Sequence, residues 1–161
     1  MNLSPTDSDV VFRLAGLLTE LKRYEEALVF FRKGLADDPG NHEALAGLGG
    51  CLSLLGHHGE AIEACIQAVR GAPEAAETHF HLGVAYSNAK QHEAAAVAFY
   101  EAVRLKPDWA EAHLGRAEEL KDFGRFDESL AAFRSALAVD PASLDDDPAL
   151  QQMYEDVARR V

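Results

Sequence analysis

Apolar residues in this chain recur at helical spacing, in two short runs separated by a turn. In residues 42–75 the first run comprises Leu45, Leu48, Gly49 and Leu52, which share one face of a helix. Gly56 follows and tolerates the left-handed backbone at which many helices end. The second run starts near Gly59, ends at Pro73 and comprises Ala61, Ile62, Cys65 and Val69. The pattern predicts a helix, a tight turn and a second helix.

This pair of helices is repeated four times, and prolines mark the interval. Pro39, Pro73, Pro107 and Pro141 follow one another at 34 residues. The units are 8–41, 42–75, 76–109 and 110–143, and equivalent positions hold residues of equivalent size. The small ones are Ala15, Gly49, Gly83 and Ala117, then Ala27, Ala61, Ala95 and Ser129, then Gly34, Ala68, Ala102 and Ala136. The larger ones beside them are Phe31, Cys65, Phe99 and Phe133. Small residues let two helices approach closely and large ones fill the remaining space, as expected of stacked repeats.

On these residues the chain resembles the tetratricopeptide repeat family over residues 8–143. The clearest stretches are Ala76-Glu77-Thr78-His79 with Leu82-Gly83 and Tyr86, and the segment from Gly124 to Ser129. The resemblance implies an all-α fold: a right-handed solenoid of four helix-turn-helix repeats, forming a single domain over 1–161. Two details depart from the pattern. Lys22 and Lys90 stand where Gly56 and Gly124 end the first helix, which predicts a different turn in those units. Arg116 stands where the other units have leucine, which indicates a more exposed last repeat.

After the fourth unit, residues 146–160 are expected to form a capping helix. Asp145, Asp146 and Asp147 precede Pro148, a composition that suits the first turn of a helix. An apolar stripe follows, made of Leu150, Met153, Tyr154, Val157 and Val161. This stripe is suited to cover the exposed side of the last repeat, as stacked-repeat proteins require. The alternative is an amphipathic helix that binds a partner.

Composition excludes several classes of function. The chain has 161 residues, 48% of them apolar, and a net charge of −12. The acidic balance and scattered Lys and Arg argue against nucleic acid and anionic membranes as partners. The chain has no apolar run long enough for a membrane helix, and its polar start lacks the pattern of a signal peptide, so we expect a cytoplasmic protein without membrane insertion. Cys51 and Cys65 fit reduced, buried thiols.

The resemblance also implies where a ligand would bind, because in the family the first helices line a concave groove. The predicted peptide-binding positions are Phe12, Glu43, Ala46, Gly47, Gly50, Glu77, Phe80, His81, Val84, Asn88, Glu111, Leu114 and Glu118. Acidic residues recur at the second position of each unit beside an apolar floor. The small residues Ala46, Gly47 and Gly50 predict a recess between Phe12 and Phe80. Both features have structural alternatives, since the helix dipole favours acids in a first turn and glycines serve close packing.

Other kinds of site receive little support. The groove lacks the Lys, Arg and Asn clamp with which some family members bind acidic carboxyl termini of chaperones. No histidine pair has the spacing of a helical zinc site, and Gly47-Leu48-Gly49-Gly50 is not a phosphate loop. Acid pairs such as Glu118 and Glu119 are interpreted as solvated helix faces. We expect no catalysis, cofactor or metal.

The sequence therefore predicts a non-enzymatic interaction scaffold or adaptor, with a protein or peptide ligand that is basic, apolar or both. One alternative is a structural protein that assembles with itself as a homo-oligomer, because the start of the first unit lacks a cap. Another is a regulatory or chaperone module of a larger system.

Overall fold

The computed structural model describes residues 7–143 and 148–161, and every regular element in these ranges is an α-helix. The helices are α1 (Asp7–Glu20), α2 (Tyr24–Asp37), α3 (His42–Leu54), α4 (His58–Gly71), α5 (Ala76–Asn88), α6 (His92–Leu105), α7 (Ala110–Asp122), α8 (Phe126–Val139) and α9 (Pro148–Ala158). The aspartates expected before α9, Asp145 to Asp147, lie outside the described residues.

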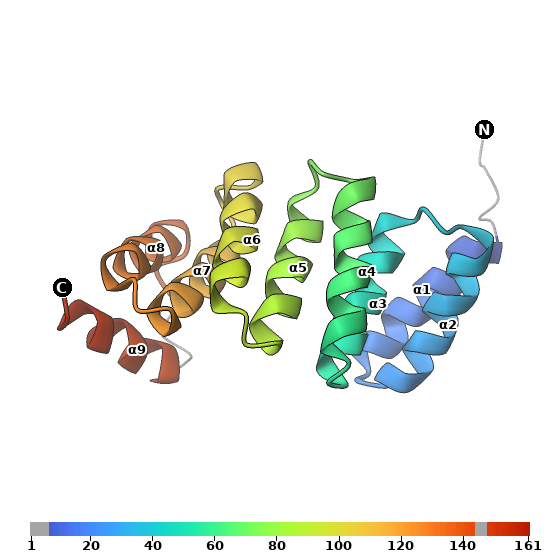
Figure 1. The fold of residues 1–161 in the computed structure, drawn as a ribbon, viewed down its shortest axis with the longest axis horizontal. Coiled ribbons are helices and arrows are strands. Elements are labelled where there is room, and N and C mark those ends of the chain that lie inside the picture. The colour runs from blue at the N-terminus through green and yellow to red at the C-terminus, as the bar shows by residue number, and fades with distance from the viewer. Residues whose placement is uncertain (1–6, 144–147) are drawn as a thin grey trace.

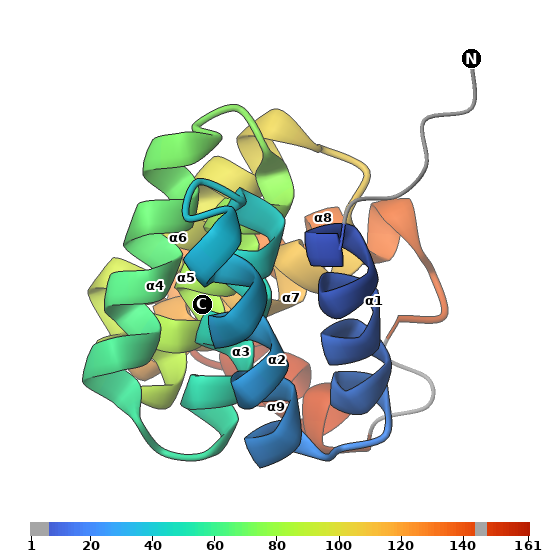
Figure 2. The ribbon, with the colours of Figure 1, turned by 90° about the vertical axis from the view of Figure 1, so that its right-hand side faces the viewer.

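The helices are stacked as pairs along an extended array, with α1 at one end and α9 at the other (Figure 1). Each odd-numbered helix from α3 to α7 packs against the even-numbered helix that follows it and against the one that precedes it. Contacts between α1 and α3, α3 and α5, and α5 and α7 continue along the array. Figure 2 shows the stack from the α1 end, with the successive pairs rotated about its long axis. The expected all-α solenoid is confirmed.

The 34-residue interval governs where the helices begin. From α3 onward the first helices start at His42, Ala76 and Ala110, and the second helices start at Tyr24, His58, His92 and Phe126. Asn41 caps α3, because its side chain accepts a hydrogen bond from the backbone N–H of Ala44 at 2.9 Å. The equivalent positions Ala75 and Trp109 make no such side-chain bond.

The turn inside each pair has the same form in all four units, contrary to the expectation from Lys22 and Lys90. Those lysines adopt φ values of 58° and 60°, in the same left-handed region as Gly56 and Gly124. Each turn is closed by an N–H that donates to a carbonyl five residues earlier, as Arg23 does to Leu18 at 2.9 Å and Arg125 to Leu120 at 2.8 Å. These bonds, with the packing of two helices, offset a lysine strain of about 1 kcal/mol.

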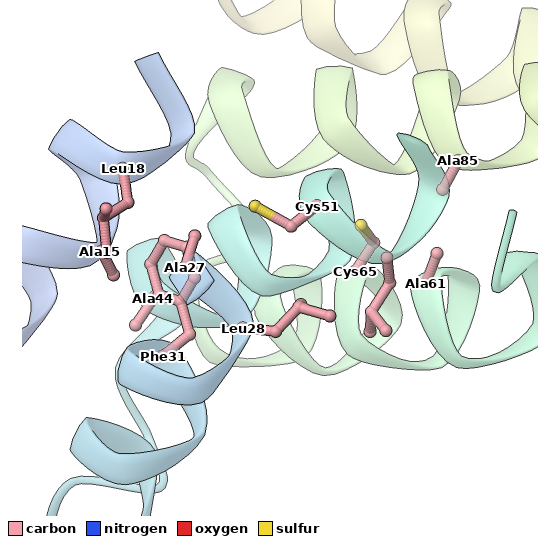
Figure 3. Packing of buried hydrophobic residues seen from close by; sticks show 11 residues of the cluster. Ala15, Leu18, Ala27, Leu28, Phe31, Ala44, Cys51, Ala61, Cys65 and Ala85 are labelled. Carbon is pink, nitrogen blue, oxygen red and sulfur yellow. The ribbon is translucent and has the colours of Figure 1, made fainter. Parts of the chain in front are cut away.

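The core is built where the small residues of the repeat meet the large ones. Figure 3 shows part of it, with Ala15, Phe31, Cys51 and Cys65 among the buried side chains between the first pairs of helices. Phe99 is buried between its own unit and the next: a Cβ on Gly83 of the same unit would lie 2.8 Å from its ring, and one on Gly115 of the next unit would lie 2.9 Å away. The absence of a side chain at both glycines is therefore what makes room for the ring.

α9 packs on the last repeat through most of the predicted stripe. Val157 is fully buried, and Tyr154 meets Phe133 edge to face with ring centroids 5.8 Å apart. Arg160 adds a guanidinium over the ring of Phe126 at 4.9 Å. Val161 was expected in the stripe, but it lies beyond the helix end and is 61% exposed.

Arg116 is accommodated by an aromatic partner. Its guanidinium carbon lies 4.9 Å from the centroid of the Tyr100 ring on α6, and the side chain is half-buried. The arginine stem covers apolar surface where the other units use leucine, while the charge rests on the ring face.

Candidate functional site

The first helices form a surface with a hollow towards each end, and we call it the first-helix surface. It consists of the exposed sides of α1, α3, α5 and α7, the four helices to which all thirteen predicted groove residues belong. Both hollows combine apolar walls with a carboxylate at the rim. The geometry between the hollows is set by the small residues of α3 and by one histidine of α5.

The hollow towards the C-terminal end lies between α5 and α7. Phe80, Val84 and Leu114 form its apolar wall, with Glu111 and Glu118 at the rim. Its volume of about 260 Å³ suits one large side chain. Leu150 of α9 also lines it. The capping helix therefore contributes to the site, which its amphipathic pattern did not indicate.

Phe80 packs against other aromatic rings beside this hollow. It stacks on Trp109 with centroids 4.5 Å apart and meets Phe99 at 5.5 Å. Lys106 lies over the Trp109 ring, with its Nζ 5.0 Å from the ring centroid and 3.6 Å from Glu77 Oε1. This edge of the surface thus already binds one ammonium group between an aromatic ring and a carboxylate.

The hollow towards the N-terminal end lies between α1 and α3. Phe12, Gly16, Phe31 and Glu43 are among its lining residues, and its volume is about 370 Å³. Phe12 also fills the space above Gly34, where a Cβ would overlap its ring. The N-terminal hollow resembles the C-terminal one in having a phenylalanine wall and an acidic residue from the start of the neighbouring first helix.

The predicted recess between the hollows is narrower than expected. Ala46 is buried, and Gly47 serves helix packing, because a Cβ there would lie 2.5 Å from the Phe31 ring. Gly50 is open apart from His81, whose Nδ1 would lie 4.0 Å from an added Cβ. Gly50 and His81 are therefore the residues of this middle region that remain for a ligand.

The acidic residues are exposed, and two of them, Glu77 and Glu111, act electrostatically on His81. Glu43, Glu77 and Glu111 all stand at the start of their helices with exposed side chains. Burial lowers the pKa of His81, and the charges of Glu111 and Glu77 act in the opposite direction. These two carboxylates are thus close enough to the imidazole to form one electrostatic cluster with it.

Polar contacts link the first helices in a way that the sequence did not indicate. Asn88, a predicted groove residue, donates from Nδ2 to Ser53 Oγ at 2.8 Å. Glu119, interpreted as solvated, is only 4% exposed, and it accepts hydrogen bonds from Ser87 Oγ at 2.5 Å and from His92 Nδ1 at 2.8 Å. The signal for its burial was its place in the repeat, where the preceding units have Cys51 and Ala85.

Several other titratable residues have structural partners or are buried. His79 and His113 each donate from Nε2 to a proline carbonyl, Pro73 and Pro107, both at 2.9 Å. Burial raises the pKa of Cys65 to about 12, which leaves it a protonated thiol. Within residues 7–143 and 148–161 no three His, Cys, Asp or Glu side chains gather as metal ligands would. No helix in those ranges is long and apolar enough to span a bilayer.

Stability is expected to depend on pH through His81. Its unfolded pKa is about 6.5 and its folded pKa is lower, so protons bind the unfolded chain preferentially in between. The contribution of the neutral His81 imidazole to the free energy of unfolding is therefore complete above the unfolded pKa. It is lost as the pH falls through the folded pKa. Thermal melts between about pH 7 and pH 5 should show a smaller decline for His81→Gln than for the unchanged chain. Equal declines would contradict this role, and His57→Gln on an exposed turn is the control.

Comparison with known proteins agrees with this architecture. Family models described as tetratricopeptide repeat match residues 18–79, 55–112 and 110–143. No curated protein matches the chain in sequence.

Solved structures of similar fold cover almost the whole chain. The structure of TTC0263, a thermophilic TPR protein of Thermus thermophilus, has a TM-score of 0.77 at 25% identity, over 95% of this chain and 82% of that chain. MamA has a TM-score of 0.77 at 22% identity, over 98% of this chain and 88% of that chain, which shows a shared fold. YrrB, described as a TPR protein with an unusual peptide-binding site, has a TM-score of 0.73 at 25% identity, over 96% of this chain and 79% of that chain.

Proposed function

Because the chain belongs to the tetratricopeptide repeat family, we propose that it is a non-enzymatic scaffold that binds a peptide segment of a partner protein along the first-helix surface. The observation that carries the proposal is the pair of apolar hollows, each with a phenylalanine wall and a glutamate rim. YrrB, of similar fold, is described as having a peptide-binding site.

The ligand's chemistry follows from the walls and the rims. Phe80, Val84 and Leu114 suit an aliphatic or aromatic anchor, whose burial contributes about 1.5–3 kcal/mol for a fully enclosed side chain. Glu111 and Glu118 at the same rim favour a Lys or Arg next to that anchor. The position of Lys106 between Trp109 and Glu77 supports this preference, because an ammonium group of the chain itself already lies on this edge. The proposed ligand is therefore an extended segment with basic residues around an apolar anchor.

Charge reversal at the rim tests this proposal. We expect Glu111→Lys to weaken binding of a Lys- or Arg-containing peptide by about tenfold, because one attractive pair becomes repulsive. The measurement is fluorescence anisotropy with peptides taken from an array that varies basic and apolar positions. Glu63→Lys, at an exposed position on the second helix α4, is the matched control and should bind normally. Equal binding by both variants would exclude the acidic rim as the selecting feature.

Substitutions at Gly50 and Phe80 test the same proposal in the same binding measurement. Gly50→Leu places a side chain into the open space before His81, so it should weaken binding while leaving helicity unchanged. Phe80→Ala should also weaken binding, but it removes the stacking on Trp109 and is expected to lower stability as well. Normal binding by both variants would show that the ligand lies elsewhere.

A further inference from the structure

The outer side of α1 carries a row of exposed apolar side chains, which we call the α1 stripe. It consists of Val10, Leu14, Leu17 and Leu21. Their exposed fractions lie between 40% and 67%, and Leu21 continues the helical pattern, with its N–H donating to the Leu17 carbonyl at 3.0 Å. Elsewhere in the described chain, large exposed apolar residues occur at most two to a helix. A contiguous patch of this kind marks an interaction surface.

In the later units the equivalent side of the first helix is buried by a neighbouring helix pair. Leu17 is the tenth residue of its unit, and the tenth residues of the later units are Cys51, Ala85 and Glu119, all 4% exposed or less. Val10 is the third, and its equivalents Ala44, Thr78 and Ala112 are likewise buried. In those units the preceding helix pair covers this side, as α1 and α2 cover α3. Figures 1 and 2 place α1 at the end of the array, where no earlier pair is described.

At its third and tenth unit positions the stripe differs from the equivalent residues of the later units, and this bears on what covers it. Where another repeat packs, the third and tenth residues are small or polar, with Ala44 and Cys51 as one example. The larger Val10 and Leu17 hold a covering helix further away, since interaxial distance depends on the side chains at the contact. The stripe is therefore suited to a helix packed side to side, rather than to one more closely stacked repeat.

The spacing and the flanking charges identify that helix. The stripe follows intervals of four, three and four residues, the seam of a two-helix coiled coil. Arg13 and Glu20 flank the seam on one side, both are exposed, and neither forms an ion pair or side-chain hydrogen bond with a described residue. When two copies of α1 run antiparallel, Leu14 faces Leu17 of the other copy, Val10 faces Leu21, and Arg13 lies beside Glu20. We propose that the α1 stripe binds the α1 stripe of a second copy of this chain, in a closed two-fold dimer.

The rest of the molecule is compatible with this arrangement. At about 100° per residue, the buried side of α1 at Ala15 and Leu18 lies roughly a third of a turn from the stripe, so the stripe takes no part in the contacts that hold α1 in the array. Phe12 lies roughly half a turn from the stripe, so its side of the N-terminal hollow stays open to a ligand, whereas Arg13 lies between the hollow and the stripe. One helix against one helix is a small interface, so the expected dissociation constant is about micromolar.

Solution mass tests the proposal. Light scattering at physiological salt, which screens the repulsion between chains of net charge −12, should show the mass rise from monomer to dimer and stop there over about a hundredfold range of concentration. Leu17→Glu should weaken the dimer at least tenfold, while Val97→Glu, exposed on α6, should not. A constant monomer mass, a mass that climbs beyond the dimer, or equal effects of the two variants would overturn the proposal.

The charged flank tests the antiparallel register independently. Arg13→Glu alone and Glu20→Arg alone should each weaken the dimer by about fivefold, because each creates like-charge pairs. The double exchange Arg13→Glu/Glu20→Arg should restore it. Circular dichroism of each variant checks that the monomer stays folded. Failure of the double exchange to restore the dimer, with the monomer folded, would refute the antiparallel pairing.

Discussion

Replacement of Phe99 by alanine is expected to lower the free energy of unfolding by about 3–5 kcal/mol. The ring is 3% exposed and fills the space above both Gly83 and Gly115. Neither glycine has a side chain that could move into the vacated volume, so the cavity persists and the cost falls in the upper part of this range. Urea unfolding followed by circular dichroism measures it.

Two matched variants make this prediction specific. Val97→Ala on the same helix removes an exposed side chain and should change the free energy of unfolding by less than about 0.5 kcal/mol. Gly83→Ala should destabilise the unchanged chain, where its Cβ would crowd the Phe99 ring, but stabilise the Phe99→Ala variant by filling part of the cavity. The same sign in both backgrounds would show that Gly83 and Phe99 are not coupled as described.

The second large effect is a difference between neighbouring glycines of α3. Gly49→Ala should destabilise by about 1–3 kcal/mol, because the new Cβ would overlap the Cys65 sulfur and lie 3.1 Å from the carbonyl oxygen of Ala61. Gly50→Ala should stabilise by up to about 1 kcal/mol, because it gains helix propensity and meets only His81, at 4.0 Å. Each variant is the control for the other, since both make the same chemical change one residue apart.

Thermal or urea unfolding of the two variants gives opposite signs if the packing is as described. Two stabilised variants would show that α3 and α4 separate easily at Gly49. Two destabilised variants would show that Gly50 is not open, which would also remove it from the proposed ligand surface.

The fold could be predicted because the repeat presents the same information four times. A single pair of amphipathic runs would be ambiguous, but Gly49, Gly83, Phe99 and Phe133 occur in a fixed register that only stacked helix pairs satisfy. The error at Lys22 and Lys90 has a physical cause. Propensity predicted a different turn, but the hydrogen bonds of the turn and the packing of the helices outweigh a strain of about 1 kcal/mol.

The site could be predicted only in part. The periodicity places Phe80, Val84, Leu114 and Glu111 on first helices, the resemblance to the family selected them as ligand positions, and the structure brings them together in one hollow. Two features depend on contacts between units and had no local signal. Leu150 lines the hollow from α9. Gly47 packs against Phe31 of the preceding unit and is therefore not open to a ligand.

The sequence by itself determined the helices, their pairing and the residues that pack within a unit, because these depend on spacings of a few residues and on side-chain volume. Only the tertiary structure decided which side chains remain exposed once neighbouring units are stacked. The tenth position of the unit illustrates the difference. Glu119 is buried there in the fourth unit and Leu17 is exposed there in the first, although a charged residue is usually exposed and a leucine usually buried. Burial at that position depends on whether a preceding helix pair covers it, and no property of the residue alone carries that information.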